Sequence, residues 1–445
     1  MNSIRKTLQE LLRYPTAIAG LITVLLLIGL AVYAMIAIPY NQALLLWRGG
    51  EDVWYQNPKF AAPAWSNYFT REKQPVSFVM NDDDAGAIKE VIKGEQNTSR
   101  INITYTFEYP YDAYPQDILL YFTSKFQEKQ PFVSIYWLTP DGRKIRISDF
   151  GVNPKQTFRL SQDEKLKRRL SGLDPMIGLF VSENGKTPVK GTYNLLIEGL
   201  VFEEDSDINA QLVFHGTVYG LFGTDHQRRD LVVPMLWGAP VALAFGLIAS
   251  LFTSVLTMII AALGAWYGGW VDELIQRITE VNLVLPFFSI LIMVGTFYSR
   301  STWTILGVTV LLSIFTGQIK VYRSTFMQVK ESTYIEAARA YGTNSWRIIF
   351  VYMIPRMIPL LIPGLVSAVP AFVFLEATLA VLGLGDPVLP TWGRMIHDAE
   401  SHGALYKGLY YWIMEPAVLL MVSGLGFAML GFALDRIFNP KLRDL

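Results

Sequence analysis

The feature that most constrains this chain is a set of uncharged stretches long enough to cross a membrane. Residues 17–38 carry no charge over 22 positions, and a second uncharged stretch runs from 231 to 271. Further uncharged stretches of 19 residues each lie at 281–299, 301–319, 357–375 and 416–434. A helix needs about 20 apolar residues to cross the hydrocarbon core. One such stretch could be a buried core helix, but six in one chain predict an α-helical integral membrane protein with six transmembrane helices.

Two of these stretches need interpretation. The stretch 231–271 is too long for one span, so we expect an interfacial segment broken by Pro234 and Pro240, followed by one helix near 241–266. The stretch 17–38 could instead belong to a signal peptide, whose apolar region would be about 7–15 residues long and end at a small-residue cleavage site. Because 17–38 is longer and ends at Pro39-Tyr40, we interpret it as a retained helix.

The orientation follows from positive charge in the short loops. Lys and Arg cluster before the first helix, between the fourth and fifth helices, and after the sixth. With six spans these segments share one side, which predicts cytoplasmic termini and a cytoplasmic loop at about 320–356. The expected divisions are 1–40 (N-terminus and helix 1), 41–222 (extracytoplasmic) and 223–445 (helices 2–6).

The extracytoplasmic segment contains no span-length apolar stretch. Short strand-like stretches occur at 100–109, 117–124, 131–139, 142–150, 176–183, 191–204 and 209–220. Asp141-Gly142 separates two of them and is typical of a hairpin turn, and 163–173 suggests a short helix. Several short strands at such spacing predict a β-rich, sandwich-like domain.

Charge and composition exclude several functions. Only 17% of the residues are charged, and 38 basic residues balance 38 acidic ones. A nucleic-acid binder would need a basic excess. Cysteine is absent, which excludes disulfides and thiolate sites. The four histidines have no zinc-site spacing, and no nucleophile-elbow motif is present. We therefore predict no catalytic residue, no metal site and no enzymatic activity in this chain.

The segment 332–355, STYIEAARAYGTNSWRIIFVYMIP, is expected to form a helical hairpin. A first helix would break at Gly342, which can take a positive φ. Asn344 or Ser345 could cap a second helix that ends at Pro355. Small residues that would allow close approach of another surface are Ala337, Ala338 and Ala340. A polar, ordered hairpin between membrane helices suits docking into a partner groove, and an ordinary solvated loop is the alternative.

This segment resembles the EAA motif of ABC-importer permeases. Glu336-Ala337-Ala338 is followed, after three residues, by Gly342. The family then has an I-x-L-P pattern, and Tyr352-Met353-Ile354-Pro355 keeps its proline but not its first residue. The resemblance implies that residues 333–346 dock on an ATPase. The coupling residues that it implies are Glu336, Ala337, Ala338, Arg339, Gly342, Ser345 and Pro355.

Further matches indicate the oligopeptide, dipeptide and nickel permeases, and among them the C-subunit type of dipeptide permease. GTDHQRRDL (223–231) resembles the GTDxxGRD segment before helix 2, with matches at Gly223, Thr224, Asp225, Arg229 and Asp230. LWGAPVAL (236–243), residues 375–399 and residues 434–443 resemble later family segments. Arg228 and Pro240 depart from the family's glycine and arginine. Ala62-Pro63-Ala64-Trp65 resembles a PxW element that usually lies just before GTD, so the β-rich region is interpreted as an insertion at about 70–219.

The resemblance implies alternating access in an assembly. The expected partners are a second permease in a heterodimer, two ATP-binding subunits, an extracytoplasmic substrate-binding protein and membrane lipid, but no nucleic acid. ATP and Mg would bind the partner ATPases, since this chain has no Walker motif and is expected to bind no cofactor. The implied location is a prokaryotic inner or plasma membrane. The implied substrates are peptides or similar small oligomers, with oligosaccharides or nickel as alternatives.

One ionisable residue, Glu376, falls inside a span, where charge is costly and often functional. It could line the translocation path or be a structural polar residue, and we favour the structural role. Two other functions stay open for the chain. An ATPase-independent channel or secondary transporter would usually show inverted repeats, which are not evident here. A membrane-anchored sensor with a β-rich receptor domain would not require the permease-like segments.

Overall fold

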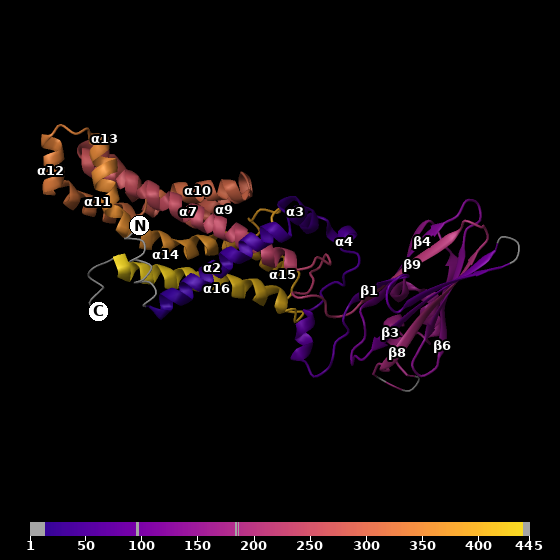
Figure 1. Cartoon of the computed structure of the whole chain (residues 1–445). Helices are drawn as coiled ribbons and strands as arrows, with labels where there is room; N and C mark the ends of the chain where they lie inside the picture. The colour runs from indigo at the N-terminus through magenta and orange to yellow at the C-terminus, as the bar shows by residue number, and fades with distance from the viewer. Residues whose placement is uncertain (1–13, 95–97, 183–184, 186, 439–445) are drawn as a thin grey trace. The chain divides into compact units, whose positions relative to one another are not determined.

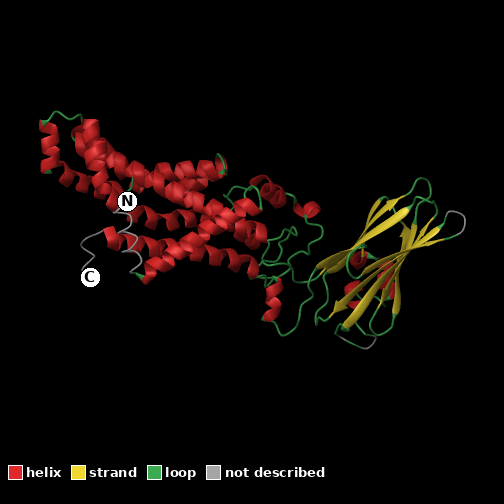
Figure 2. Cartoon of the chain, in the orientation of Figure 1, coloured by secondary structure: helices red, strands yellow, loops and turns green. Residues whose placement is uncertain are grey.

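The computed structural model describes residues 14–94, 98–182, 185 and 187–438. It divides the chain into two compact units. The membrane unit contains the chain up to Arg48 and from Val233 onward, and the strand unit contains Gly49–Val232. Figures 1 and 2 show that the first unit is built of helices and that the second contains the strands. Both chain ends, which we expect to be cytoplasmic, lie outside the described residues.

The membrane unit contains long apolar helices joined by shorter ones. Its elements are α2 (Pro15–Ala37), α3 (Tyr40–Arg48), α7 (Val232–Tyr267), α8 (Gly269–Val284), α9 (Phe287–Phe297), α10 (Thr302–Ile314), α11 (Gly317–Lys330), α12 (Thr333–Ala340), α13 (Ser345–Arg347), a π-helical turn (Ile348–Met353), α14 (Ile354–Val381), α15 (Trp392–Ser401) and α16 (Tyr411–Phe438). Helices α2, α7, α14 and α16 share a buried apolar cluster that includes Leu27, Ala242, Val373 and Phe427.

Among the described residues, four helical segments are long and apolar enough to cross a membrane. Two bent helix pairs raise that number to six if each pair is one span: α8 with α9, bent by 76°, and α10 with α11, bent by 49°. Outward residues of α2 and α16 such as Leu26 and Phe432 are 69% and 72% exposed, as lipid contact requires. The chain is thus a multi-pass helical membrane protein.

Helix α7 differs from the expectation that prolines would break it. It runs without interruption from Val232 to Tyr267 and includes Pro234 and Pro240. Pro234 lies in the first turn, where a backbone N–H has no partner within the helix. Pro240 lies inside the helix, where neighbouring helices can satisfy the freed carbonyl. The helix instead ends at Tyr267, where Gly268 takes a positive φ of 64°. A separate bend lies between α8 and α9, where Leu285 leaves the helix before Pro286.

The strand unit is a β-sandwich of two antiparallel sheets. The four-stranded sheet has the order β1-β9-β4-β7 and the five-stranded sheet the order β2-β3-β8-β5-β6. The strands are β1 (Phe78–Asn81), β2 (Ala87–Lys93), β3 (Ser99–Tyr109), β4 (Asp117–Lys125), β5 (Phe132–Leu138), β6 (Lys144–Gly151), β7 (Lys155–Arg159), β8 (Gly191–Val201) and β9 (Asp207–His215). Large aromatic residues fill the space between the sheets, including Tyr105, Trp137, Tyr193 and Phe214.

Most expected elements of this unit are present. Strands occur at six of the seven predicted stretches, the turn at Asp141-Gly142 joins β5 to β6, and α5 (Glu164–Arg169) follows its cap Asp163. The predicted strand at 176–183 is wrong. A short helix, α6 (Pro175–Gly178), begins there because Asp174 accepts a hydrogen bond from the Met176 amide and Pro175 favours the first helical position.

Candidate functional site

The EAA-like segment forms a helix, a tight turn and a second helix. Gly342 has φ of 73°, as its position in the motif predicted. The Gly342 amide donates to the Arg339 carbonyl at 2.9 Å, and the Thr343 amide donates to the Ala338 carbonyl at 3.0 Å. These two bonds form a Schellman motif, which ends a helix with a left-handed residue. The turn therefore depends on glycine for its backbone conformation.

The second helix begins as expected but does not end as expected. The Asn344 side chain accepts a hydrogen bond from the Trp346 amide at 3.2 Å, which confirms a cap at this position. The helix was expected to end at Pro355, but it continues to Val381. The π-helical turn Ile348–Met353 lies directly before the proline. A wider turn there accommodates the ring and its missing N–H, so the helix that follows the Gly342 turn continues directly into a membrane helix. We call residues 333–346 the coupling turn, after the role that the resemblance implies.

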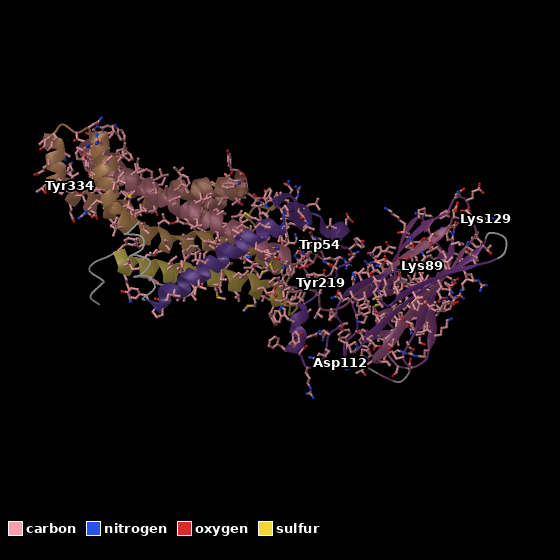
Figure 3. The ribbon with its side chains drawn as sticks, viewed as in Figure 1. Trp54, Lys89, Asp112, Lys129, Tyr219 and Tyr334 are labelled. Carbon is pink, nitrogen blue, oxygen red and sulfur yellow. The ribbon has the colours of Figure 1, made fainter. Side chains whose placement is uncertain are left out.

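The turn presents an exposed aromatic surface. Tyr341 is 91% exposed, Trp346 is 53% exposed, and Trp346 stacks on Phe350 with ring centroids 5.8 Å apart. Tyr334, labelled in Figure 3, is 42% exposed. Exposed apolar patches of this kind mark interaction sites. The turn thus combines a fixed backbone with a surface suited to a protein partner.

A buried side chain anchors helix α12 to the rest of the membrane unit. Ile335 is fully buried and packs in a cluster with residues of α7, α11 and the π-helical turn. Glu336, Ala337 and Arg339 are exposed, and Ala338 is partly exposed. The predicted coupling residues from Glu336 to Gly342 therefore lie together on α12 and the turn that ends it. Ser345 and Pro355 lie on the following helix, and Pro355 is ten residues beyond Ser345.

Basic residues connect α12 to the end of α7. The Arg339 guanidinium lies over the Trp266 ring, 4.5 Å from its centroid. The Lys330 Nζ donates to the carbonyls of Ala265 and Trp266, both at 2.9 Å. The Arg323 Nε donates to Asp272 Oδ1 at 2.6 Å and joins α11 to α8. We call Trp266, Lys330 and Arg339 the basic–tryptophan contact.

Sequence reasoning missed this contact. A tryptophan near a helix end is typical of membrane interfaces, so the sequence predicts only an interfacial position for Trp266. Lys330 counted only as a positive loop charge, and Arg339 as a coupling residue exposed to a partner. The available signal was a tryptophan at the end of one helix and two basic residues in the last turns of α11 and α12, but their proximity depends on the tertiary packing.

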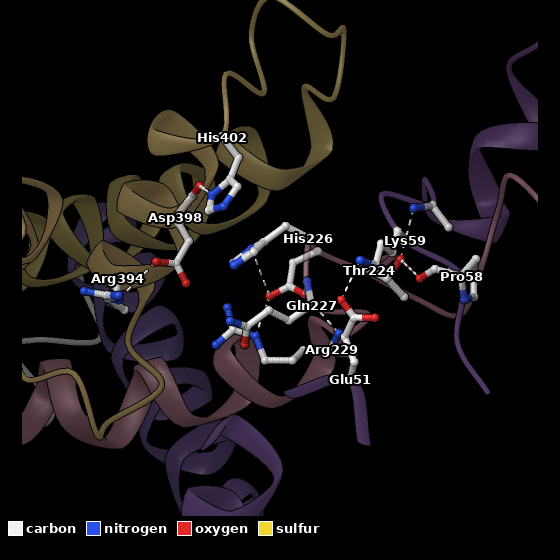
Figure 4. Close-up of polar contacts among 12 residues, drawn as sticks. Glu51, Pro58, Lys59, Thr224, His226, Gln227, Arg229, Arg394, Asp398 and His402 are labelled. Carbon is white, nitrogen blue, oxygen red and sulfur yellow. Dashed lines mark hydrogen bonds and ion pairs between the residues drawn. The ribbon is translucent and has the colours of Figure 1, made fainter. Parts of the chain in front are cut away.

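The GTD segment folds as a compact turn within the strand unit. Asp225 is fully buried and accepts hydrogen bonds from the Gln227 amide at 2.8 Å, the Arg229 amide at 2.9 Å and Arg229 Nε at 2.5 Å. Burial raises the pKa of Asp225, and Arg229 opposes that shift. Thr224 donates to the Pro58 carbonyl at 2.8 Å (Figure 4).

The ends of this turn are also defined. Gly223 has φ of 74°, and the Leu231 amide donates to its carbonyl at 3.1 Å. The Asp230 carboxylate accepts from the Val232 amide at 2.9 Å, at the start of α7. The five predicted residues of this segment are therefore brought together, and the contacts that they make fix the local chain path.

Arg228 stands where the family has glycine, and its backbone conformation is one that glycine favours. It has φ of 64°, a left-handed conformation that glycine adopts without strain. Its Nη1 donates to the Asn57 carbonyl at 2.6 Å and to His215 Nδ1 at 3.2 Å, and its Nε is 3.6 Å from Glu51. Since arginine only donates, His215 accepts at Nδ1 and is neutral. Burial and the Arg228 charge lower the pKa of His215 to about 3.

Glu376 lies on α14 and is 7% exposed. Its carboxyl group is hydrogen-bonded to the Thr391 side chain. Thr391 also caps α15 by accepting from the Arg394 amide at 3.2 Å, and Arg394 pairs with Asp398 at 3.1 Å (Figure 4). Glu376 therefore contacts the start of a neighbouring helix within the membrane unit.

The membrane unit thus combines several apolar helices with an ordered helical turn whose aromatic surface is exposed. Residues 254–444 match the family of the binding-protein-dependent transport system inner membrane component. Over these residues, the match confirms the resemblance to ABC-importer permeases.

Curated relatives agree with this family. The chain is 28% identical to the dipeptide transport system permease protein DppC of Bacillus subtilis (strain 168), over 50% of this chain and 69% of that protein. It is 27% identical to the glutathione transport system permease protein GsiD of Pectobacterium atrosepticum, over 50% and 73%. It is 27% identical to the oligopeptide transport system permease protein OppC of Bacillus subtilis (strain 168), over 50% and 72%.

Proposed function

We propose that this chain forms a translocation path for peptides together with a second permease. The named relatives transport dipeptides, oligopeptides or glutathione, which supports a peptide or similar small oligomer as the substrate. Two cytoplasmic ATPases would bind ATP and Mg, and an external binding protein would deliver the substrate. Nucleotide binding drives transport only if it favours one conformation of the assembly over another.

The exposed coupling turn is the observation that carries this proposal. Residues 333–346 would dock in a groove on an ATPase, with Tyr341 and Trp346 as apolar contacts and Glu336 at the rim. The second helix of the turn continues into α14, so a displacement of the docked turn would move a membrane helix directly. The basic–tryptophan contact would transmit the same displacement to α7.

The proposed orientation places the coupling turn in the cytoplasm and the β-sandwich outside. The positive charges before helix 1, around 320–356 and after helix 6 support this assignment. It requires six spans, which the two bent helix pairs allow. In this arrangement Glu376 and the GTD segment have structural roles, since their polar groups are engaged by neighbouring parts of the chain.

The substitution Gly342→Val tests the coupling role. Valine resists the left-handed conformation, at a cost of about 1–2 kcal/mol. That cost would reduce the population of the correctly shaped turn by roughly 5- to 30-fold. We expect ATP hydrolysis that continues in reconstituted vesicles while ATP-dependent peptide uptake falls by a similar factor.

Gly342→Asn is the matched control, because asparagine tolerates a positive φ better than other residues. It should retain most of the uptake. Normal uptake by the valine variant would contradict docking through this turn. Uptake by the unmodified chain that needs an ion gradient and no ATPase would instead support the secondary-transporter alternative, and absence of transport with a full set of partners would support the sensor.

A further inference from the structure

The outer face of the four-stranded sheet contains a groove of about 480 Å³. This volume falls within the usual range for small-ligand sites. Strands β1, β4, β7 and β9 form the groove together with Tyr55. Side chains that line it include Tyr55, Asn81, Tyr121, Thr123, Asn209 and Gln211. The groove lies entirely within the strand unit and is separate from the coupling turn.

The strand register explains why polar groups gather there. Residues directly paired across an antiparallel sheet point to the same face. One row crosses all four strands and consists of Thr157, Tyr121, Gln211 and Asn81. The next row consists of Lys155, Thr123 and Asn209. The sequence thus places amides, hydroxyls and an aromatic ring in two adjacent rows.

A chain of hydrogen bonds holds these side chains in place. Gln56 Nε2 donates to Tyr55 Oη at 3.1 Å and to Gln211 Oε1 at 3.2 Å. Gln211 Nε2 donates to Asn81 Oδ1 at 2.7 Å. Asn81 Nδ2 continues the chain to Asp84 at 3.0 Å. Polar groups fixed before binding lose less conformational freedom when a ligand arrives.

Asn209 and the aromatic end of the groove are held in the same way. The Lys89 Nζ (Figure 3) donates to Asn209 Oδ1 at 2.5 Å. The rings of Tyr55 and Tyr121 meet edge to face, with centroids 4.8 Å apart, and Tyr55 remains 38% exposed. An exposed, immobilised ring beside ordered amides provides a flat apolar surface next to hydrogen-bonding groups.

The charges at the groove nearly cancel. Lys89 is paired with Asp207 at 2.9 Å and lies 3.6 Å from Asp82. Lys155 on β7 and Asp82, directly after β1, line the groove with one charge of each sign. A strongly charged ligand would therefore gain little electrostatic binding energy from this groove. A neutral ligand rich in groups that both donate and accept hydrogen bonds matches side-chain amides, which also do both.

We propose that this groove binds a short neutral oligosaccharide. The amides of Asn81, Asn209 and Gln211 would bond to neighbouring sugar hydroxyls. The exposed ring of Tyr55 would pack against the apolar face of one sugar ring. The site is independent of peptide transport and of the partner ATPases, so it can be tested in the isolated full-length chain.

Calorimetry on the full-length chain in nanodiscs tests the proposal. The probes are maltotriose, cellotriose, xylotriose and chitotriose, with trialanine as the peptide comparison. We expect saturable binding of at least one trisaccharide. Gln211→Ala and Asn209→Ala should each weaken it by about tenfold, because each removes contacts to the sugar hydroxyls.

Asn102→Ala is the matched control, because Asn102 is an amide on β3 in the five-stranded sheet, and it should leave binding unchanged. Thermal unfolding of each variant shows whether the sandwich remains folded. Absence of saturable binding by all four sugars would overturn the proposal. Sugar binding that Gln211→Ala and Asn209→Ala leave unchanged would also overturn it, as would competition in which trialanine binds more tightly than every sugar. None of these results depends on whether the chain transports peptides.

Discussion

Gly238 of α7 allows two parts of the membrane unit to approach closely. A Cβ atom added to it would lie 2.2 Å from Trp392 Cδ1 and 2.3 Å from Trp392 Nε1. Trp392 is 2% exposed, and its Nε1 donates to the Met235 carbonyl at 3.0 Å. Both residues belong to segments that resemble the permease family. The contact therefore packs those two segments against each other.

Gly238→Ala should destabilise the membrane unit. An added methyl group in a tightly packed site typically costs about 1–3 kcal/mol, and Trp392 could move only by losing its hydrogen bond. We expect a lower temperature of thermal unfolding in detergent and less monodisperse protein. Gly307→Ala in α10 is the control, since its Cβ would meet no atom within 4 Å. Equal stability of the two variants would contradict this close approach.

At the residue scale, sequence patterns identified local conformations better than contacts. The positive φ of Gly342 and the cap at Asn344 were predictable because each depends on a few adjacent residues. The pairing of Arg228 with His215 was not predictable. It joins positions 13 residues apart through burial in a folded domain, and the left-handed φ of an arginine has no signature in the sequence.

Helix α12 depends on its neighbours for the position of its exposed surface. Arg339 contacts the Trp266 ring, and Lys330 binds the last carbonyls near the end of α7. A cation–π contact at a partly exposed site contributes about 0.5–1 kcal/mol. The contact is thus too weak to hold the fold together, but strong enough to bias the position of a short helix.

Trp266→Ala should weaken transmission without preventing assembly. We expect the ATPases to co-purify as before, while peptide uptake per ATP hydrolysed falls severalfold. Trp266→Tyr should retain most of the uptake because it retains an aromatic face. The double variant Trp266→Ala with Arg339→Ala should be no worse than the worse single variant, since residues in direct contact act non-additively. Fully additive losses would show that the two residues act separately.

At the element scale, the apolar stretches predicted the membrane helices because hydrocarbon requires long uncharged helices. The exact helix ends were less predictable. Pro240 was expected to lie before a helix near 241–266 and Pro355 to end a helix, yet both lie within continuous helical segments. Local proline preferences were overridden by packing in α7 and by a π-helical turn before α14. The segment 176–183 has strand-like composition, but its cap at Asp174 and Pro175 directs a short helix.

The chain segments that lead into and out of the β-sandwich lie side by side. Val76 and Val218 form a parallel bridge, and the Thr217 amide donates to the Pro75 carbonyl at 2.9 Å. All nine strands lie between Phe78 and His215. A region that begins and ends at adjacent points can be removed without stretching the remaining chain.

Replacing residues 77–216 by a short Gly-Ser linker should therefore leave a chain that inserts and assembles. We expect unchanged co-purification of the ATPases and unchanged basal ATP hydrolysis, measured after reconstitution. Sugar binding at the proposed groove should disappear. A control with the same linker placed between β5 and β6, at Asp141-Gly142, keeps the sandwich. Failure of the deletion variant alone to assemble would mean that the sandwich is required for the permease fold.

Helix α14 contains prolines at positions 355, 359, 363 and 370. The first three are spaced four residues apart and so lie along one side of the helix. Each proline removes a backbone hydrogen bond and crowds the carbonyl one turn earlier. The bending stiffness of α14 therefore depends on direction. Bending away from the proline side requires less energy than bending in other directions. A helix with such a preferred bending plane would convert an undirected push at the end that follows the Gly342 turn into one defined movement within the bilayer.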